Sequence, residues 1–547
     1  MISKKLSIGH CSLSFMLAFL PLSAAYAQQD STLNRTVVVE NEYNPDIMDA
    51  SKINVLPKVE EPAVVKKGIE YATALRPVSA WTYESMSPIT REWPMKQAKR
   101  GYIRGGYGNY GNVDFKAGYL WDITQKDRLK VGVSLDGRNG TLDDWLGEDW
   151  KSRFYRSQFR LGYSHDFSRF TLDLGGKFGS QTFNYMPVLK ESPANNQTHT
   201  IGDFHIGLAS RDESLPLQFR VQTGIQYFGV KHPVMYAYPT DFGNETKIHT
   251  LGEVWGKLSG EQRVGIAFQM DNLMYSADSL MNNRTSLCLN PYYMLEGESW
   301  KIRLGAHVDL LSGDDNGVDV APDVKLDYLF SDSYVFYVHA LGGRELNDYH
   351  RLNSLSPYWY MYGSLPDTYV SVDAKAGLKA SPVNGLWFNV FGGYRVSQDE
   401  LFSGLSLGRT FFCDDKAKTA YAGAEVKYGY KDLFDLSAKG VYYSWNADGS
   451  WDGGGDIAAR KPELELNLRA DARVFPGLRI HAGYEYVKRK ESQIDPVSNL
   501  YVGADYEFLP DLSVFGYVNN LLNKTYTYES GYPAEKLNVL AGFSWTF

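Results

Sequence analysis

The stretch that decides the fold runs from residue 464 to residue 486 and reads LELNLRADARVFPGLRIHAGYEY. Every second residue from Leu464 to Val474 is apolar, and charged or polar residues fill the positions between them. Phe475-Pro476-Gly477 interrupts the pattern, which resumes from Leu478 to Tyr486. Because successive side chains of a β-strand face opposite sides, the stretch predicts two strands joined by a tight turn, each with one apolar and one charged face.

The same period of two continues outward over residues 101–547, for example from Ile302 to Leu310 and from Ala422 to Tyr428. Short turns are predicted at Thr124–Asp127, Phe330–Ser333, Lys431–Asp432, Phe475–Gly477 and Leu509–Asp511. Longer connections alternate with them, at Asn139–Ser152, Glu345–Asp367, Leu401–Ala417 and Asn446–Lys461. A soluble β-sandwich would also show alternating faces, but this alternation of turn lengths is typical of a barrel in the bacterial outer membrane. We therefore predict an all-β fold, a transmembrane antiparallel outer-membrane β-barrel of a Gram-negative bacterium.

The strand pattern predicts about 22 strands. Strand boundaries can be placed only to within a few residues, so counts from 16 to 22 fit the pattern. The first and last strands must pair, because lipid cannot satisfy an open strand edge. In the last strand, residues 536–547, the lipid-facing positions are Leu537, Val539, Ala541, Phe543, Trp545 and Phe547. We expect the terminal aromatic Phe547 to be the signal for the barrel assembly machinery, in addition to packing among the aromatic residues at the membrane boundary.

The composition agrees with a barrel that has one lipid face and one wet face. The chain contains 39 Tyr, 27 Phe, 12 Trp and 51 Gly, while its mean hydropathy is only -0.34. Tyr and Trp favour the membrane–water boundary, where the apolar part of the ring and its polar group are both accommodated. The formal net charge of -8 argues against a nucleic-acid partner, which would require a basic surface.

The N-terminal 27 residues have the features of a cleaved signal peptide. Lys4 and Lys5 precede an apolar run from Leu13 to Ala24, and Ala25-Tyr26-Ala27 supplies the small residues of a cleavage site. Residues 28–100 form an extended tail that is rich in Pro, Glu and Lys and too poor in apolar residues for a core of its own. The tail is predicted to thread the lumen or to lie in the periplasm as a docking segment, and residues 101–547 to form the barrel.

The C-terminal region contains the run from Leu512 to Tyr526, LSVFGYVNNLLNKTY, followed by Gly531-Tyr532-Pro533 and the closing strand. This sequence resembles the end of TonB-dependent receptor barrels. It implies a barrel of about 22 strands that carries a solute across the outer membrane with a TonB-type energiser as partner. Members of the family also carry a globular plug of more than about a hundred residues inside the barrel, and residues 28–100 are too few to form such a plug. Thr36-Val37-Val38-Val39 resembles the TonB-binding box, a first plug strand, or a plain linker.

No catalytic, metal or cofactor site is predicted, because the ten histidines form no paired motif with serine, cysteine or carboxylate. His307, His339 and His481 alternate with apolar residues and are expected to line the lumen. The Asp314-Asp315-Asn316-Gly317 sequence is interpreted as a hairpin loop instead of a calcium loop, since the later glutamate ligand is missing. Cys288 and Cys413 are interpreted as two unrelated single cysteines. Lumen charges of both signs predict ion pairs across neighbouring strands.

Two functions follow from this reading. The first is a transport protein derived from TonB-dependent receptors, and the second is a non-transporting scaffold or accessory subunit that supports other envelope proteins. A barrel hydrolase finds no residues to support it. A barrel of about 22 strands is too wide for side chains alone to fill, so we predict that the tail or a partner polypeptide seals the lumen.

Overall fold

The computed structural model describes residues 99–547 except for short gaps at 144–146, 188–195, 213, 233, 236–238, 241–242, 277–279, 314–315, 332, 362, 407, 432, 450–455, 493 and 530. The predicted signal peptide, nearly all of the tail, and Thr36, Val37, Val38 and Val39 lie outside the described residues. None of the residues in the described part of the chain forms a helix long and apolar enough to cross a membrane.

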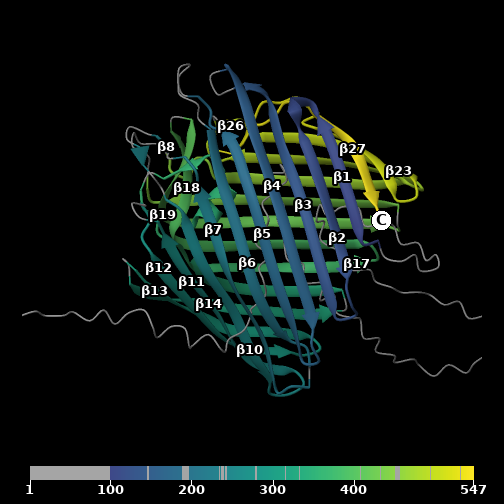
Figure 1. The fold of residues 1–547 in the computed structure, drawn as a ribbon. Helices are drawn as coiled ribbons and strands as arrows, with labels where there is room; N and C mark the ends of the chain where they lie inside the picture. Colours follow the sequence, from purple (N-terminus) through teal and green to yellow (C-terminus); the bar gives the residue numbers. More distant parts are fainter. Residues whose placement is uncertain are drawn as a thin grey trace, which may run out of the picture. The chain divides into compact units, whose positions relative to one another are not determined.

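A sheet of 23 strands dominates the described residues, and all of its strands except the two-residue β16 form a closed antiparallel barrel of 22 (Figure 1). The barrel strands are β1 (Gly101–Gly108), β2 (Val113–Asp122), β3 (Asp127–Asp143), β4 (Asp149–Asp166), β5 (Phe170–Asn184), β6 (Asn196–Ser210), β7 (Leu217–Val230), β10 (Glu245–Lys257), β11 (Gln262–Tyr275), β12 (Arg284–Glu296), β13 (Trp300–Ser312), β14 (Gly317–Ser331), β15 (Tyr334–Glu345), β17 (Thr368–Val383), β18 (Leu386–Ser406), β19 (Arg409–Tyr430), β20 (Phe434–Ala447), β21 (Pro462–Phe475), β22 (Leu478–Arg489), β23 (Val497–Leu509), β24 (Leu512–Asn519) and β27 (Asn538–Thr546). The connections contain η1 (Asn109–Gly111), β8 (Val234–Met235), β9 (Pro239–Thr240), α1 (Tyr349–Leu355), β16 (Trp359–Tyr360), β25 (Thr527–Glu529) and β26 (Tyr532–Pro533).

The barrel closes between its first and last strands, as predicted. β1 pairs antiparallel with β27 from Tyr102 opposite Thr546 to Gly108 opposite Leu540. At the base of this seam the carbonyl of Phe547 accepts hydrogen bonds from the backbone N–H of Arg100, at 2.9 Å, and of Gly101, at 2.8 Å. The ladder therefore has no open edge, which is the condition for a sheet to stand in lipid.

The two faces of the strands divide as the alternation predicts. In β27, Val539, Phe543 and Trp545 are exposed on the outside, whereas Asn538 and Ser544 are buried on the lumen side. The same division extends around the barrel, where large apolar side chains are exposed outward, among them Phe159, Phe178, Phe204, Val264, Leu304 and Leu468. A continuous apolar exterior around a polar interior is stable only in a bilayer, so the protein resides in the outer membrane.

The predicted turns are confirmed at the end of the barrel where the chain termini enter the wall, which is the periplasmic end. Two predicted connections are wrong, because Asn139–Ser152 and Leu401–Ala417 consist largely of strand. The ends of β18 and β19 extend beyond the apolar belt, where outward positions carry residues such as Lys418 and inward positions carry buried Phe402. Polar exteriors above the membrane removed the alternation signal that the prediction relied on.

Inward-facing aromatic rings lie flat against glycines of neighbouring strands. A side chain built on any of these glycines would meet the ring beside it, and the pairs are Tyr292 on Gly265, Tyr337 on Gly377, Phe391 on Gly423, Tyr421 on Gly393 and Tyr501 on Gly483. This contact explains why Tyr337 is only 2% exposed although it faces a wide lumen. Tyr337, Phe391 and Val441 form a small apolar cluster on the lumen wall, with Tyr421 and Tyr443 packed against it.

Candidate functional site: a loop across the extracellular mouth

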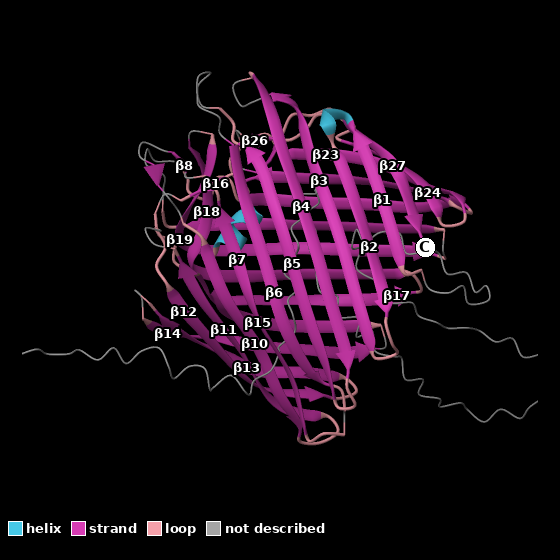
Figure 2. Cartoon of the chain, in the orientation of Figure 1, coloured by secondary structure: helices cyan, strands magenta, loops and turns pink. Residues whose placement is uncertain are grey.

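The connection between β15 and β17, residues 346–367, folds into the extracellular end of the barrel and is named the cap loop here. It contains α1, which begins at Asp348, whose carboxylate accepts the backbone N–H of Arg351 at 2.8 Å and so caps the helix. α1 ends at Ser356, whose N–H donates to the carbonyl of Leu352 at 3.0 Å. Figure 2 shows this short helix against the ring of strands.

The cap loop lies where the end of β19 approaches the end of β5 at the mouth. On one side, β16 pairs in parallel with β19, with Trp359 opposite Thr410. On the other side, Tyr358 packs edge-on against Phe183 of β5, with ring centroids 5.1 Å apart. Counted along the closed sheet, β5 is the fifth and β19 the sixteenth of 22 barrel strands, so the two start from opposite sides of the barrel wall.

Aromatic packing holds the cap loop in place. Rings in mutual contact form the mouth cluster, a name used here for Phe154, Phe183, Tyr185, His199, Phe228, Tyr349, Tyr358, Trp359 and Tyr532. Tyr349 and Phe228 are 0% exposed. Tyr358 stacks on Tyr532 at 3.7 Å, which joins the cap loop to the connection between β24 and β27. Each such pair contributes about 0.5–1.5 kcal/mol beyond the burial of its area.

Buried ion pairs fix both ends of the cap loop. Lys247 of β10 contacts the Asp348 carboxylate at 2.5 Å, and Arg284 of β12 contacts Asp367 at 2.8 Å. Burial alone would raise the pKa of Asp348, but the Lys247 ammonium beside it holds that pKa well below its ordinary value. Removing one partner of a buried pair costs about 3–5 kcal/mol, because the other charge is left without compensation. These ion pairs therefore hold the cap loop in a fixed conformation against β10 and β12.

One group of side chains at the cap loop has the spacing of a metal site. Glu245 of β10, Asp348 and His350 each offer one ligand atom, and the three atoms lie within 4.8 Å of one another. In the same place, the backbone N–H of Tyr349 donates to Glu245 at 2.8 Å. Sequence reasoning missed this group, since its members lie about a hundred residues apart and only the tertiary fold brings them together.

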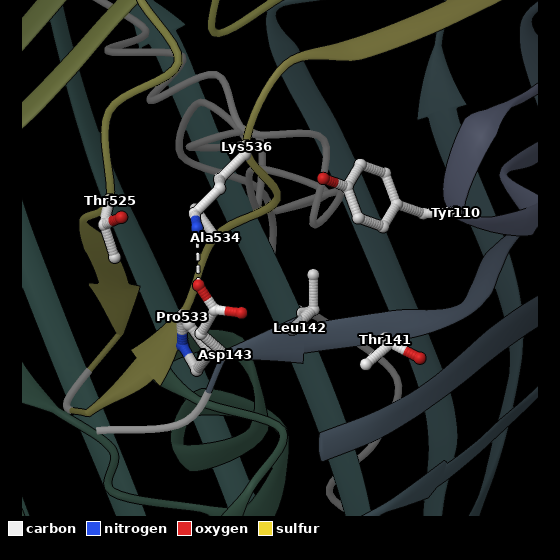
Figure 3. Close-up of a pocket in the computed structure, with 8 residues that line it drawn as sticks. All are labelled: Tyr110, Thr141, Leu142, Asp143, Thr525, Pro533, Ala534 and Lys536. Atoms are coloured by element: carbon white, nitrogen blue, oxygen red, sulfur yellow. Dashed lines mark hydrogen bonds and ion pairs between the residues drawn. The ribbon is translucent and has the colours of Figure 1, made fainter. Parts of the chain in front are cut away.

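A shallow groove lies at the rim of the mouth between the end of β3 and the connection from β24 to β27. Its lining residues are Tyr110, Thr141, Leu142, Asp143, Thr525, Pro533, Ala534 and Lys536. Lys536 and Asp143 contact each other across the groove at 2.5 Å, as Figure 3 shows with a dashed line. The two charges pair with each other, and both side chains stay exposed at the rim.

The lumen wall confirms the predicted mixture of charges. Arg303 pairs with Asp323 at 2.6 Å and Lys427 with Glu425 at 2.8 Å, both on inward positions of the wall. His339 and His481 face inward beside Asp327 and Asp505, and His307 lies 3.2 Å from the Cys288 sulfur. Cys288 and Cys413 are both free, as predicted.

The structure describes only one of the predicted partner-binding residues. Phe547 is 39% exposed on the outer face and stacks on Tyr119 of β2 with ring centroids 5.8 Å apart. The cap loop itself was predicted as a plain connection between Glu345 and Asp367. The signal that would have revealed it is its composition, because Tyr358, Trp359, Tyr360 and Met361 form an apolar run that an exposed loop would not carry.

Comparison with solved structures identifies the fold. The FrpB iron transporter from Neisseria meningitidis superposes with a TM-score of 0.65 at 9% identity and covers 83% of each chain. The ferric enterobactin receptor PfeA from Pseudomonas aeruginosa gives 0.61 at 13% identity, covering 82% of this chain and 80% of the receptor. This is the fold of the TonB-dependent receptors. The pyoverdine receptor FpvA from Pseudomonas aeruginosa gives a TM-score of 0.59 at 13% identity and covers 84% of this chain and 80% of the receptor.

The TonB-dependent receptor fold confirms the resemblance seen in the C-terminal sequence. These structural neighbours are receptors and transporters, not enzymes. No family model matches the sequence, and no curated protein matches it either. At 9–13% identity, the likeness to these structures is a likeness of fold.

Proposed function

We propose that this protein transports a solute across the outer membrane in the manner of TonB-dependent receptors. The observation that carries the proposal is the closed barrel of 22 strands, which matches two receptors and an iron transporter over more than four-fifths of this chain. Those proteins are named for ferric enterobactin, pyoverdine and iron, so an iron-carrying ligand is the first solute class to test.

The same proposal assigns the ends of the chain. Residues 1–27 are a signal peptide removed on export, and residues 28–100 are a tail whose Thr36–Val39 segment contacts a TonB-type energiser. Lys99 pairs with Asp511 at 2.5 Å in a periplasmic turn, which supports an exit of the tail on the periplasmic side. Phe547, exposed at the base of β27, is the residue through which the barrel assembly machinery recognises the chain.

Transport requires the cap loop to move. Twenty-two strands spaced about 4.8 Å apart and tilted about 40° enclose a cylinder roughly 45 Å across at the backbone. Side chains on the wall leave most of this width open, so the loops at the extracellular mouth and the tail are the parts of the chain available to close it. A solute would enter only after the contacts of the mouth cluster are released on one wall.

Single-channel conductance in planar bilayers tests this arrangement. The full mature chain should show little steady conductance, and a variant lacking residues 28–100 should show more if the tail contributes to the seal. No change on that deletion would assign the seal to the cap loop and its neighbours. A large steady conductance of the full chain would contradict closure of the lumen altogether, and with it a gated transport function.

The alternative is a non-transporting scaffold or accessory subunit of an envelope complex. The observation that favours it is the cap loop, which is tied to β10 and β12 by buried ion pairs and to β19 and β5 by strand pairing and aromatic packing. Gentle detergent purification of the native protein, followed by identification of what co-purifies, separates the two functions. A TonB-type energiser together with ligand-dependent uptake supports transport, whereas a stable stoichiometric envelope complex without uptake supports the scaffold.

A further inference from the structure

The side chains where α1 meets β10 carry more negative charge than the surrounding cations neutralise. Four carboxylates lie together at this contact and are at most 4% exposed, namely Glu245, Asp271, Asp348 and Asp367. Lys247 contacts Asp348 and Arg284 contacts Asp367, while Asp271 and Glu245 contact only His249 and His350 among the charged groups of the described residues, so two negative charges are left whenever both imidazoles are neutral. Unpaired buried charge is costly, and a bound divalent cation would supply the missing two positive charges.

The ligand atoms of the site already stand at the separation that a metal centre needs. The Oε1 atom of Glu245 and the Nδ1 atom of His350 are 3.5 Å apart, and a carboxylate oxygen of Asp348 lies within 4.8 Å of both. A tetrahedral ion with bonds of about 2.05 Å holds its ligand atoms about 3.4 Å apart. Asp348 is held by Lys247 and by the backbone N–H of Arg351, so its carboxylate has to turn from Lys247 toward the ion to reach this distance.

Two buried oxygens beside Asp348 lack donors. The Oδ1 atom of Asn347 and the Oδ2 atom of Asp367 accept no hydrogen bond from the described residues, although Asn347 is 0% and Asp367 is 4% exposed. The two residues are linked, since the N–H of Asn347 donates to the other carboxylate oxygen of Asp367 at 2.9 Å. Buried acceptors without donors are rare in folded proteins, and the Nε of Arg284 beside Asp367 is a buried donor without an acceptor in the described part of the chain, so a bound water molecule at this end of the cap loop would satisfy these groups.

We propose that Glu245, Asp348 and His350 bind a divalent transition-metal ion of the zinc class, which latches the cap loop to β10. An imidazole nitrogen together with carboxylate oxygens suits Zn²⁺, whereas Ca²⁺ and Mg²⁺ take oxygen ligands. Asp348 and His350 belong to the cap loop and Glu245 belongs to the wall, so the ion joins two elements that are otherwise held by packing and ion pairs. A water molecule completes the coordination. The bound ion would hold the cap loop across the mouth whether the barrel transports a solute or serves as a scaffold.

Lys247 gives the proposal a distinctive prediction. Its ammonium holds the same Asp348 carboxylate at 2.5 Å, so the metal and Lys247 compete for one ligand. Replacing Lys247 with methionine removes the competitor and one positive charge, and Zn²⁺ should then bind more tightly. If the cluster were only an ion-pair network, the same substitution would loosen the cap loop and Zn²⁺ would not restore it.

The test is calorimetric titration of Zn²⁺ into the full mature chain, folded in detergent and carrying no polyhistidine tag. One equivalent should bind, His350→Gln and Glu245→Gln should weaken binding by at least about 10- to 100-fold, and Lys247→Met should strengthen it. His232→Gln, which alters an exposed histidine outside the cluster, is the matched control and should bind as the unmodified protein does. Heat-modifiable migration in gels establishes that each variant is folded.

Hydrogen exchange of the cap loop provides a second readout. Zn²⁺ should slow exchange over residues 346–367 in the unmodified protein and in His232→Gln, and should have no effect in His350→Gln. The proposal is overturned if the unmodified protein binds no Zn²⁺, or if His350→Gln binds it equally well. It is also overturned if exchange of the cap loop responds to protonation of His350 but not to the metal, because protons would then supply the missing charge.

Discussion

A single added methyl group on the lumen side of β18 should destabilise the barrel. A side chain at Gly393 would overlap the ring of Tyr421, whose hydroxyl donates to Asp373 at 2.6 Å. Either the ring stays and the wall is overpacked, at about 1–3 kcal/mol, or it swings away and loses a hydrogen bond to a charged group, at about 1.5–3 kcal/mol. Gly393→Ala should therefore lower the free energy of unfolding by about 1–3 kcal/mol relative to a matched alanine elsewhere in the strand.

The neighbouring residue supplies that matched control. Gly392 faces the lipid, and the nearest atom to a side chain built there is a backbone oxygen at 3.6 Å, an ordinary contact. Both alanines restrict the unfolded chain equally, so this effect, about 0.4–1 kcal/mol, cancels in the comparison. Urea unfolding in lipid vesicles gives the difference in midpoint, and Tyr421→Ala combined with Gly393→Ala should recover part of the loss. Equal midpoints for the two single variants would refute the packing of Tyr421 on Gly393 and the assignment of inner and outer faces in β18.

Three further predictions concern the mouth, a loop and the last residue. Arg284→Met should leave Asp367 without compensation and cost about 3–5 kcal/mol locally, seen as faster hydrogen exchange of the cap loop; unchanged exchange would contradict the role of the pair. Burial raises the pKa of Asp456, but hydrogen bonds from Lys490 and from the backbone N–H of Ala458 lower it by more, so the pKa lies below its ordinary value. The ion pair of Asp456 with Lys490, at 2.5 Å, should therefore persist from pH 7 to about 4 and be lost only as the pH falls through the lowered pKa, which hydrogen exchange of residues 456–461 measures. Phe547→Ala should reduce the fraction assembled in the outer membrane, whereas Phe543→Ala on the same outer face should not; equal assembly would remove Phe547 as the signal.

The cap loop changes how the seal of the lumen is understood. The sequence predicts a seal made by the tail or by a partner polypeptide, because the barrel is too wide for side chains to fill. The cap loop adds a third element, which reaches from β5 to β19 and is anchored at both walls. Conductance of the chain with and without residues 28–100 therefore measures how much of the seal each part provides.

The sequence by itself determined the class of fold, the number of strands and the faces of each strand. The alternation from Leu464 to Val474 fixes which side chains meet lipid, since a strand has a strict period of two and a bilayer tolerates only apolar side chains on its side. The resemblance from Leu512 to Tyr526 extended this to the TonB-dependent receptor barrel. The faces of a strand can be read within a dozen residues, and the number of strands follows from repeating that reading along the chain.

Only the tertiary structure decided what happens at the extracellular mouth. The cluster of Glu245, Asp348 and His350 joins residues about a hundred positions apart, and the contact of Tyr358 with Tyr532 joins residues still further apart. No period in the sequence marks such pairs, because above the membrane both faces of a strand can be polar and loops follow no repeat. The lipid requires alternating apolar and polar residues in the strands of the wall. The conformation of the cap loop instead depends on the side chains that closure of the barrel brings opposite it.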